Sequence, residues 1–445
     1  MDLHAERARL SGAISVPGSK SHTIRACILA ALAEGRSVIS NPLPSADCVS
    51  ACRAIAEIGA KVTRQKGDAT WLIDGAGKRA HLPDNVVDVG NSGSTLYFLS
   101  PIAATFSGWS VFTGDESIRS RPVRHVSDAL TQLGAETHIT RPGFDAPPLL
   151  IRGAIHAGRV VTDGRLSQYV SGMMMAATRL DGTLEIELTD AKELPYLTMT
   201  RQWLESLGVP VEISADFRHI RVTGPRRFAG FERTIPSDWE AVAFPLVAAL
   251  ITDSNIMVEH IDGSGSQGDD AIVGILQSVG ANIEWDRAAE RLRVRGGNRL
   301  CAPKNGLCVN ASGFPDMVPA LSVAACFIEG DTVIEDIGVC RRKETDRVDV
   351  MQTELAKLGA NVESGADSLT IHGHSPLLPD GRRNPAFALR GGVTVESYAD
   401  HRVAMSLAVL GLALDGGLTI SGAECCSVSF PGFAEAMNGI GAGYR

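Results

Sequence analysis

The sequence predicts a two-domain α/β protein built from six copies of one structural unit. Three observations support this prediction. A glycine between two apolar residues ends a helix-like stretch six times, at intervals of about 75 residues. Almost entirely apolar helices lie within these intervals, and strand-like segments follow them. The chain of 445 residues also exceeds what a single hydrophobic core ordinarily holds, so the six units should divide between domains.

The six glycines mark the expected ends of helices. They are Gly59, Gly134, Gly208, Gly280, Gly359 and Gly441. Glycine is favoured just after a helix because it adopts a positive φ without the strain that a Cβ atom causes. We therefore expect a helix before each glycine and a strand after it.

A second helix in each unit is apolar on nearly all sides, which predicts burial inside a bundle. Examples lie at residues 28–33, 245–250, 322–327 and 405–412. The segments 256–261 and 332–337 follow two of them and have the length and β-branched content of strands. Each unit should therefore contain two helices and several strands. Periods this long favour closed globular domains over a solenoid.

Two proline-containing segments predict where the chain passes between domains. Residues 16–20 and 234–238 each place a proline and small polar residues between a strand and a helix start. We expect residues 18–235 to hold units one to three, and residues 1–17 together with 236–445 to hold the rest. A cleft between two such domains is the expected ligand site.

The composition is that of a soluble globular protein, with 44% hydrophobic and 21% charged residues. The net charge of -9 gives no reason to expect a nucleic acid or an anionic membrane as partner. The N-terminus lacks the apolar region of a secretory signal, and the apolar stretches are too short to span a membrane. Nine cysteines without paired C-x-x-C spacing indicate reduced thiols rather than a zinc site, and we expect a cytoplasmic protein.

Polar motifs recur at the same edge of several units. The densest covers residues 341–347, Arg-Arg-Lys-Glu-Thr-Asp-Arg, for which a solvated charged face is the alternative interpretation. Residues 17–21 lead into a helix, where free backbone N–H groups and Lys20 would favour an anion. That segment lacks the spacing of a Walker A loop. Residues 91–95 form a second small-residue loop that opens a helix.

Taken together, these motifs resemble EPSP synthase over essentially the whole chain. The matching segments are Lys20-Ser21 to Arg25, Asn91 to Thr95, Arg121-Pro122, Ser167-Gln168, Pro195-Tyr196, Pro315-Asp316, Lys343-Glu344-Thr345-Asp346-Arg347 and Asp400-His401-Arg402. The resemblance implies an inside-out α/β barrel fold with six βαβαββ-type repeats and an active site between the domains. The Lys-Glu-Thr-Asp-Arg and Asp-His-Arg segments point to this family rather than to the related UDP-N-acetylglucosamine enolpyruvyl transferases.

The reaction that the resemblance implies joins phosphoenolpyruvate to a hydroxyl of shikimate 3-phosphate, with loss of phosphate from a tetrahedral intermediate. It needs no metal or other cofactor, because cations hold the anionic substrates while an acid and a base move protons. It also implies a place in aromatic amino acid biosynthesis. Both domains belong to one chain, so a monomer suffices.

The resemblance assigns a role to each matching residue. Arg347 and Arg402 would clamp the enolpyruvate carboxylate, a task that suits the planar fork of arginine. Asp316 and Glu344 would transfer protons, with Lys343 beside the acceptor. Three side chains would face the phosphate of phosphoenolpyruvate, and these are Lys20, Arg121 and Gln168.

The remaining assignments concern the acceptor and the loops around it. Ser21 and Arg25 would hold its ring carboxylate, with Tyr196 nearby. The other expected substrate-binding residues are Asn91, Gly93 and Ser167.

Three of the matching residues have structural alternatives. Asp316 follows a proline where a helix could begin, so it could serve as a cap. His401 is expected to form structural hydrogen bonds, and Asp346 is expected to orient a neighbouring arginine.

The sequence departs from the family pattern on both sides of the expected site. Tyr97 stands where the family has an arginine facing phosphoenolpyruvate, and Val428 stands where many members have a lysine. At the acceptor's 3-phosphate, the family places hydroxyls and a cation where this chain has Leu166, Glu193 and Leu194. A carboxylate beside a phosphate dianion is unfavourable unless it is protonated or paired.

Three functions remain open from the sequence. The first is enolpyruvyl transfer to shikimate 3-phosphate or to a related shikimate-like acid. The second is a lyase that removes water or phosphate from a shikimate-like acid without phosphoenolpyruvate. The third is a non-catalytic binding or regulatory protein, which the joint retention of the cationic and acidic residues disfavours.

Overall fold

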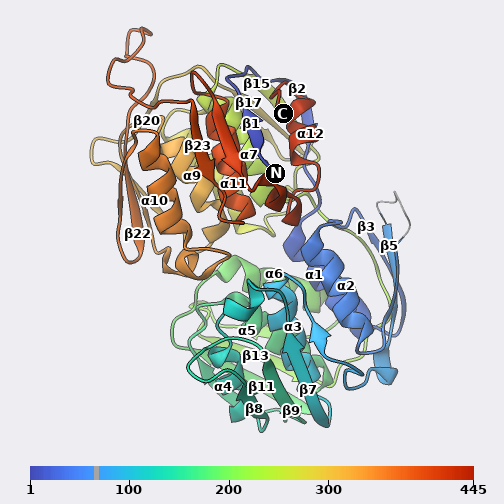
Figure 1. The fold of residues 1–445 in the computed structure, drawn as a ribbon. Coiled ribbons are helices and arrows are strands. Elements are labelled where there is room, and N and C mark those ends of the chain that lie inside the picture. Colours follow the sequence, from blue (N-terminus) through green and yellow to red (C-terminus); the bar gives the residue numbers. More distant parts are fainter. Residues whose placement is uncertain (65–69) are drawn as a thin grey trace. The chain divides into compact units, whose positions relative to one another are not determined.

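The computed structural model describes residues 1–64 and 70–445, and the chain divides into two compact units. Unit 1 comprises Met1–Pro17 and Ser237–Arg445, and unit 2 comprises Gly18–Pro236 (Figure 1). In the described part of the chain, no helix is both long and apolar enough to cross a membrane.

Unit 2 contains three repeats, each with two helices and a small sheet. Its helices are α1 (Lys20–Leu32), α2 (Ala46–Ala56), α3 (Gly93–Ala103), α4 (Arg124–Gln132), α5 (Ser167–Ala176) and α6 (Leu194–Ser206). Its strands are β3 (Gly35–Ser40), β4 (Lys61–Arg64), β5 (Thr70–Gly75), β6 (Val87–Asp88), β7 (Gly108–Thr113), β8 (Glu136–Ile139), β9 (Leu149–Gly153), β10 (Arg159–Thr162), β11 (Gly182–Leu188), β12 (Val211–Ile213), β13 (His219–Gly224) and β14 (Glu232–Thr234).

Unit 1 repeats the same order of elements. Its helices are α7 (Trp239–Ile251), α8 (Ala271–Ser278), α9 (Val318–Ala325), α10 (Arg347–Lys357), α11 (His401–Gly411) and α12 (Phe433–Asn438). Its strands are β1 (Leu3–Ala5), β2 (Ser11–Ser15), β15 (Asn255–Glu259), β16 (Asn282–Asp286), β17 (Arg291–Arg295), β18 (Leu300–Cys301), β19 (Leu307–Asn310), β20 (Ile328–Glu335), β21 (Asn361–Ser364), β22 (Ser368–Gly373), β23 (Val393–Glu396) and β24 (Leu418–Ser421). The expected strands at 256–261 and 332–337 correspond to β15 and β20, although β20 begins four residues earlier.

The sheets share one pairing scheme. In the order β6-β7-β9-β8, the first two strands are parallel and the later pairs are antiparallel, and β10-β11-β13-β12 repeats this. The two strands that precede the crossings between units join sheets in the same way. Strand β14 pairs in parallel with β3 in unit 2, and β2 pairs in parallel with β15 in unit 1. Strand β14 therefore belongs to a sheet of unit 2, although the next helix, α7, lies in unit 1. In the same way, β2 belongs to a sheet of unit 1, although the next helix, α1, lies in unit 2.

The six marker glycines lie within three residues of the ends of α2, α4, α6, α8, α10 and α12. All six have positive φ, between 76° and 103°. The predicted helix ends are therefore confirmed, since only glycine adopts this conformation without strain.

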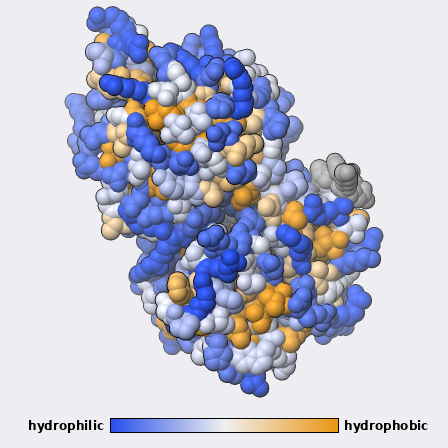
Figure 2. Space-filling model, in the orientation of Figure 1, coloured by the Kyte–Doolittle hydropathy of each residue, from blue (hydrophilic) through white to orange (hydrophobic). Residues whose placement is uncertain are grey.

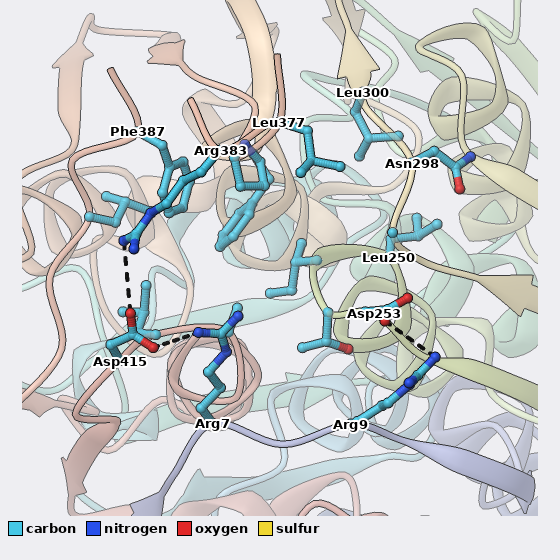
Figure 3. Close-up of a pocket in the computed structure, with 18 of the residues that line it drawn as sticks. Arg7, Arg9, Leu250, Asp253, Asn298, Leu300, Leu377, Arg383, Phe387 and Asp415 are labelled. Atoms are coloured by element: carbon cyan, nitrogen blue, oxygen red, sulfur yellow. Dashed lines mark hydrogen bonds and ion pairs between the residues drawn. The ribbon is translucent and has the colours of Figure 1, made fainter. Parts of the chain in front are cut away.

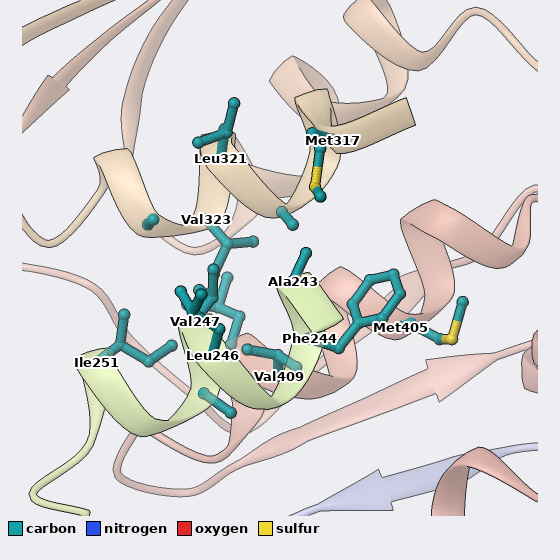
Figure 4. Packing of buried hydrophobic residues seen from close by; sticks show 14 of the residues in the cluster. Ala243, Phe244, Leu246, Val247, Ile251, Met317, Leu321, Val323, Met405 and Val409 are labelled. Atoms are coloured by element: carbon teal, nitrogen blue, oxygen red, sulfur yellow. The ribbon is translucent and has the colours of Figure 1, made fainter. Parts of the chain in front are cut away.

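The helices that the sequence marks as apolar form the core of each unit. Every residue of α7 is buried, and α7 packs against α9 and α11. Figure 4 shows this packing, with Val247 of α7 near Val323 of α9 and Val409 of α11, and Phe244 of α7 near Met405 of α11. The visible surface is mostly hydrophilic, with separate hydrophobic patches (Figure 2).

The marker glycine of the fourth repeat gives a test of this architecture. A Cβ atom at Gly280 would have space, with its nearest neighbour 3.6 Å away, but φ is +95°. We expect Gly280→Ala to lower the free energy of unfolding by about 1–3 kcal/mol through backbone strain. Gly274 lies within α8, has ordinary φ and has open space around it. Gly274→Ala should raise stability by about 0.4–1 kcal/mol. Chemical denaturation of both variants measures the two signs, and a neutral Gly280→Ala would contradict the assigned helix end.

Candidate functional site

In both units, most of the predicted functional residues lie at or near the starts of helices. In unit 2, α1 begins at Lys20, α3 at Gly93 and α5 at Ser167. In unit 1, a 3-10 turn at Pro315–Met317 precedes α9, and α11 begins at His401. The first turn of a helix offers unsatisfied backbone N–H groups and the positive end of the helix dipole, both of which favour anions.

The N-terminus of α1 carries a lysine that is already paired. Lys20 Nζ lies 3.4 Å from Asp47 Oδ2, and both side chains are largely buried. Asp47 belongs to the first turn of α2, so this ion pair joins the starts of two helices. The next residue, Ser21, is half-buried, and its carbonyl accepts a hydrogen bond from Arg25.

Arg25 is fully enclosed in unit 2. Its guanidinium donates to Thr200 Oγ1 at 2.8 Å and to the Tyr196 carbonyl at 3.1 Å, and it lies over the ring of Phe98. Burial lowers the pKa of Arg25 to about 10, although nearby Tyr196 and Glu193 act in the opposite direction. The arginine thereby ties α1 to α6, and it remains a cation at neutral pH.

The starts of α3 and α5 are linked by side chains. Ser92 caps α3 by accepting from Thr95 N, and Gln168 Nε2 lies 3.5 Å from Ser94 Oγ. Asn91 is half-buried in the turn before α3. Gly93 is the first residue of that helix, and a Cβ atom there would meet no neighbour within 4 Å. These residues surround two helix starts in unit 2.

Ser167 is bound by a carboxylate of the chain itself. Its backbone N–H and its hydroxyl both donate to Glu193 Oε2, at 3.0 and 2.7 Å. Glu193 occupies the N-cap position of α6, three residues before Tyr196. Of the residues that depart from the family pattern, Glu193 therefore contacts an expected substrate-binding residue directly.

Tyr97 supports the segment that carries Arg121. The Tyr97 hydroxyl donates to the Pro122 carbonyl at 2.7 Å, and its ring packs against His125. Arg121 is buried at the end of a 3-10 turn. Tyr97, which stands where the resemblance implies an arginine, thus holds the backbone next to Arg121.

The acidic motifs of unit 1 converge on Arg347, whose side chain is only 1% exposed. Its Nε and Nη2 donate to the two oxygens of Asp400 at 2.7 and 3.3 Å. Its Nη2 also donates to Glu344 Oε2 at 2.8 Å, and its Nη1 donates to Asp316. Burial alone would lower the pKa of Arg347, but Asp400, Glu344 and Asp316 raise it well above its usual value.

Lys343 is the second cation beside these carboxylates. Its Nζ lies 3.7 Å from Asp316 Oδ1, and its side chain is largely buried. Asp316 and Glu344 retain partial exposure, at 16% and 23%. The two predicted proton-transfer groups therefore share one guanidinium, and a lysine lies beside one of them.

Arg402 forms an ion pair with Glu240, which lies in the first turn of α7. Both side chains are buried, and the Arg402 guanidinium lies 6.0 Å from the centre of the Phe244 ring. The sequence reasoning missed Glu240, although it is the only charged residue in the apolar segment 239–251. A single charged residue in an otherwise apolar helix was the sequence signal that could have identified Glu240.

Asp269 is a second acidic residue that the sequence reasoning missed. It is buried, and its Oδ1 has no hydrogen-bond partner among the described residues. Burial raises the pKa of Asp269 well above its usual value, with further contributions from Asp316 and Asp238. This environment favours the neutral form of the carboxyl group.

The structural alternatives are resolved in part. Met317, not Asp316, holds the N-cap position of α9, so the capping interpretation of Asp316 is wrong. Asp346 caps α10 and also accepts from Arg341 at 2.7 Å, as expected of a residue that orients an arginine. His401 is buried at the start of α11. Val428 is half-buried at the end of the 3-10 segment Ala423–Val428.

A large cavity elsewhere in unit 1 contains none of the predicted residues. It has a volume of about 820 Å³ and lies at the C-terminal ends of α7 and α11, beside Leu250 and Asp415 (Figure 3). Of the predicted residues of unit 1, Arg402 lies at the start of α11, Asp316 lies just before α9, and the others lie at or just before the start of α10. The cavity's cations are paired as well, because Arg7 and Arg383 contact Asp415. This cavity therefore does not coincide with the predicted site residues of unit 1.

The chain is similar to known proteins along its whole length. The 3-phosphoshikimate 1-carboxyvinyltransferase of Ruminiclostridium cellulolyticum is 36% identical over 441 residues, covering 99% of each chain. The Halobacterium salinarum protein of the same name is 36% identical over 443 residues, covering 98% of this chain and 97% of its own. EPSP synthase from Acinetobacter baumannii superposes with a TM-score of 0.81 at 26% identity, with 100% of this chain and 99% of that chain covered.

A more distant structure shows the same fold. The enolpyruvyl transferase NikO from Streptomyces tendae has a TM-score of 0.79 at 18% identity, and 100% of this chain and 98% of that chain are covered. The expected enolpyruvyl transferase fold is confirmed by these similarities. Residues 5–437 match the family described as EPSP synthase (3-phosphoshikimate 1-carboxyvinyltransferase), and the chain belongs to that family.

Proposed function

We propose that this protein transfers the enolpyruvyl group of phosphoenolpyruvate to a hydroxyl of shikimate 3-phosphate or a related shikimate-like acid, releasing phosphate. Relatives named for this transfer are similar along the whole chain. Most of the residues that the motif resemblance assigns to substrates lie at or near helix starts in both units.

The observation that carries the proposal is the pair of carboxylates on Arg347. Asp316 and Glu344 are bonded to the same guanidinium, and Lys343 lies beside Asp316. Addition of the acceptor hydroxyl to C2 of phosphoenolpyruvate requires a base for the hydroxyl proton and an acid for C3. Loss of phosphate then requires removal of a proton from C3. Two adjacent carboxyl groups and an ammonium group supply such an acid and base.

The cations of unit 2 fit the anionic parts of the substrates. Lys20 and Arg121 would bind the phosphate of phosphoenolpyruvate, and Gln168 would donate to the same group. Electrostatic stabilisation by fixed cations and helix starts suits a reaction in which phosphate departs. Arg25 and Ser21 would attract the ring carboxylate of the acceptor.

Product analysis tests the proposal. The protein is incubated with phosphoenolpyruvate and either shikimate or shikimate 3-phosphate, and both phosphate release and product mass are measured. We expect phosphate release only when both substrates are present, and a product heavier than the acceptor by the enolpyruvyl group. Loss of water or phosphate from the acid in the absence of phosphoenolpyruvate would instead support a lyase.

The proposed carboxylate clamp predicts a severe effect of Arg402→Lys. A lysine retains the charge but cannot form two parallel hydrogen bonds to one carboxylate. We expect a loss of about 2–4 kcal/mol of transition-state stabilisation, by analogy with removal of a preorganised donor. Steady-state measurement of kcat/KM reports the loss, and Arg295→Lys on the surface is the control. Wild-type turnover in Arg402→Lys would exclude a direct role for Arg402.

The ion pair between Glu240 and Arg402 predicts competition with the substrate. The carboxylate of Glu240 is paired with Arg402, and Arg402 is the arginine that is proposed to bind the carboxylate of phosphoenolpyruvate. We expect Glu240→Gln to lower the thermal stability of the unliganded protein, because a buried guanidinium loses a partner. We also expect phosphoenolpyruvate to bind about tenfold more tightly, equivalent to about 1.4 kcal/mol.

Thermal unfolding with and without phosphoenolpyruvate measures both effects. The control is Glu284→Gln, which removes an exposed carboxylate paired with Arg295 and should change little. Weaker binding of phosphoenolpyruvate by folded Glu240→Gln would show that Glu240 supports the arginine rather than competes for it.

A further inference from the structure

The turn between β23 and α11 in unit 1 contains two consecutive residues with a left-handed backbone. Tyr398 and Ala399 have φ of 52° and 57°. Residues other than glycine adopt this conformation at a cost in free energy, so it persists only where surrounding contacts hold it. The next residue, Asp400, caps α11 and binds Arg347. The position of this charged group therefore depends on what holds the turn.

Glu354 of α10 holds the turn from a neighbouring helix, and its side chain is completely buried. Its Oε1 accepts a hydrogen bond from the Tyr398 hydroxyl at 3.0 Å, and its Oε2 accepts from the backbone N–H of Glu396 at 3.1 Å. Lys357, three residues further along α10, donates to both oxygens at 2.8 and 2.7 Å. A buried carboxylate is stable when it is paired and hydrogen-bonded in this way.

Helix α10 contacts the segment around the turn at two points. Arg347 and Glu354 are seven residues apart, which is about two turns of an α-helix, so both lie on one face of α10. Arg347 binds Asp400 after the turn, and Glu354 binds the hydroxyl of Tyr398 within it. Between these contacts, the Ala399 N–H donates to Ser397 Oγ at 3.1 Å. The turn is therefore fixed on both sides by one helix.

The turn in turn fixes the start of α11. The Asp400 N–H donates to the Ser397 carbonyl at 2.9 Å, and Asp400 Oδ1 accepts from the Arg402 N–H at 2.8 Å. A shift of the turn would thus move Asp400, and with it the guanidinium of Arg347 and the first residues of α11. Small displacements of groups that orient a substrate weaken binding and catalysis.

We propose that Glu354 is a positioning residue that acts through the turn at Tyr398 on the groups that would bind the enolpyruvyl carboxylate. Those groups are Arg347 and Arg402, and Asp400 connects both of them to the turn. The inference rests on the proposed function, because that function assigns the carboxylate to these two arginines. Glu354 acts from a distance, since its own oxygens are bonded within the chain.

Tyr398→Phe tests the inference with the smallest change, because it removes one hydroxyl from a residue that is 45% exposed. We expect the KM for phosphoenolpyruvate to rise about fivefold, since a hydrogen bond to a charged group is lost and part of that loss reaches the arginines. The KM for the acceptor and kcat should change by less than about twofold. A merely structural role would instead reduce the amount of folded protein, which lowers kcat and leaves both KM values unchanged.

Tyr444→Phe is the matched control in the same unit. The buried hydroxyl of Tyr444 has no hydrogen-bond partner among the described residues. This variant should therefore keep the wild-type KM for both substrates.

Glu354→Gln tests whether the carboxylate is the anchor. An amide oxygen can replace only one of the two carboxylate oxygens, so we expect the KM for phosphoenolpyruvate to rise about tenfold. Adding Tyr398→Phe to Glu354→Gln should raise it by less than about twofold more, because both changes remove the same hydrogen bond. A wild-type KM in either folded single variant, or fully multiplied effects in the double variant, overturns the inference. If Glu354→Gln does not fold, Tyr398→Phe still decides.

Failure of the proposed function is recognised separately, in the wild-type protein. If the wild type releases no phosphate from phosphoenolpyruvate with either acid, the transfer reaction is contradicted. Amide hydrogen exchange of residues 396–403 then tests the anchoring without any substrate. We expect faster exchange in Tyr398→Phe than in Tyr444→Phe, and equal exchange would overturn the role of Glu354 in holding the turn.

Discussion

The charged centre of unit 1 depends on the buried guanidinium of Arg347. A buried arginine is stable only when carboxylates and hydrogen bonds replace its lost hydration. Asp400 provides two of these bonds and also caps α11, so the same carboxylate fixes a helix start and an ion pair. Asp316 and Glu344 reach the guanidinium from the turn before α9 and the segment before α10. The positions of the proposed proton-transfer groups follow from the need to neutralise one buried charge.

The repeat explains why functional residues occur at similar places in both units. Each buried helix is apolar along its length, so polar side chains are tolerated mainly at its start, where backbone N–H groups remain unsatisfied. The side chains of Asp238, Asp400 and Ser92 accept hydrogen bonds from some of these N–H groups. Lys20 and Ser167 lie at equivalent starts in unit 2. A fold built by repetition thus produces several anion-favouring positions without a specialised loop.

Much of this architecture could be predicted from local sequence. The marker glycines and the apolar helices depend on backbone conformation and burial, which neighbouring residues largely determine. The pairing of β2 with β15 and of β14 with β3 could not be predicted in this way, because strand pairing depends on partners that are distant in the sequence. The same limit applies to the site. The motifs predict Arg347 and Arg402 as substrate-binding cations, but their carboxylate partners Asp400 and Glu240 are set by tertiary packing.

Glu193 shows the limit most clearly. Its place before Leu194-Pro195 suggests a residue that caps its own helix, whereas its carboxylate binds the start of α5. Like Glu240 on Arg402, Asp47 on Lys20 and Asp400 on Arg347, it is a buried carboxylate that contacts a group expected to receive a substrate anion. Each makes an incoming anion compete with a charge that the protein already holds, while a neutral hydroxyl donor meets no such competition.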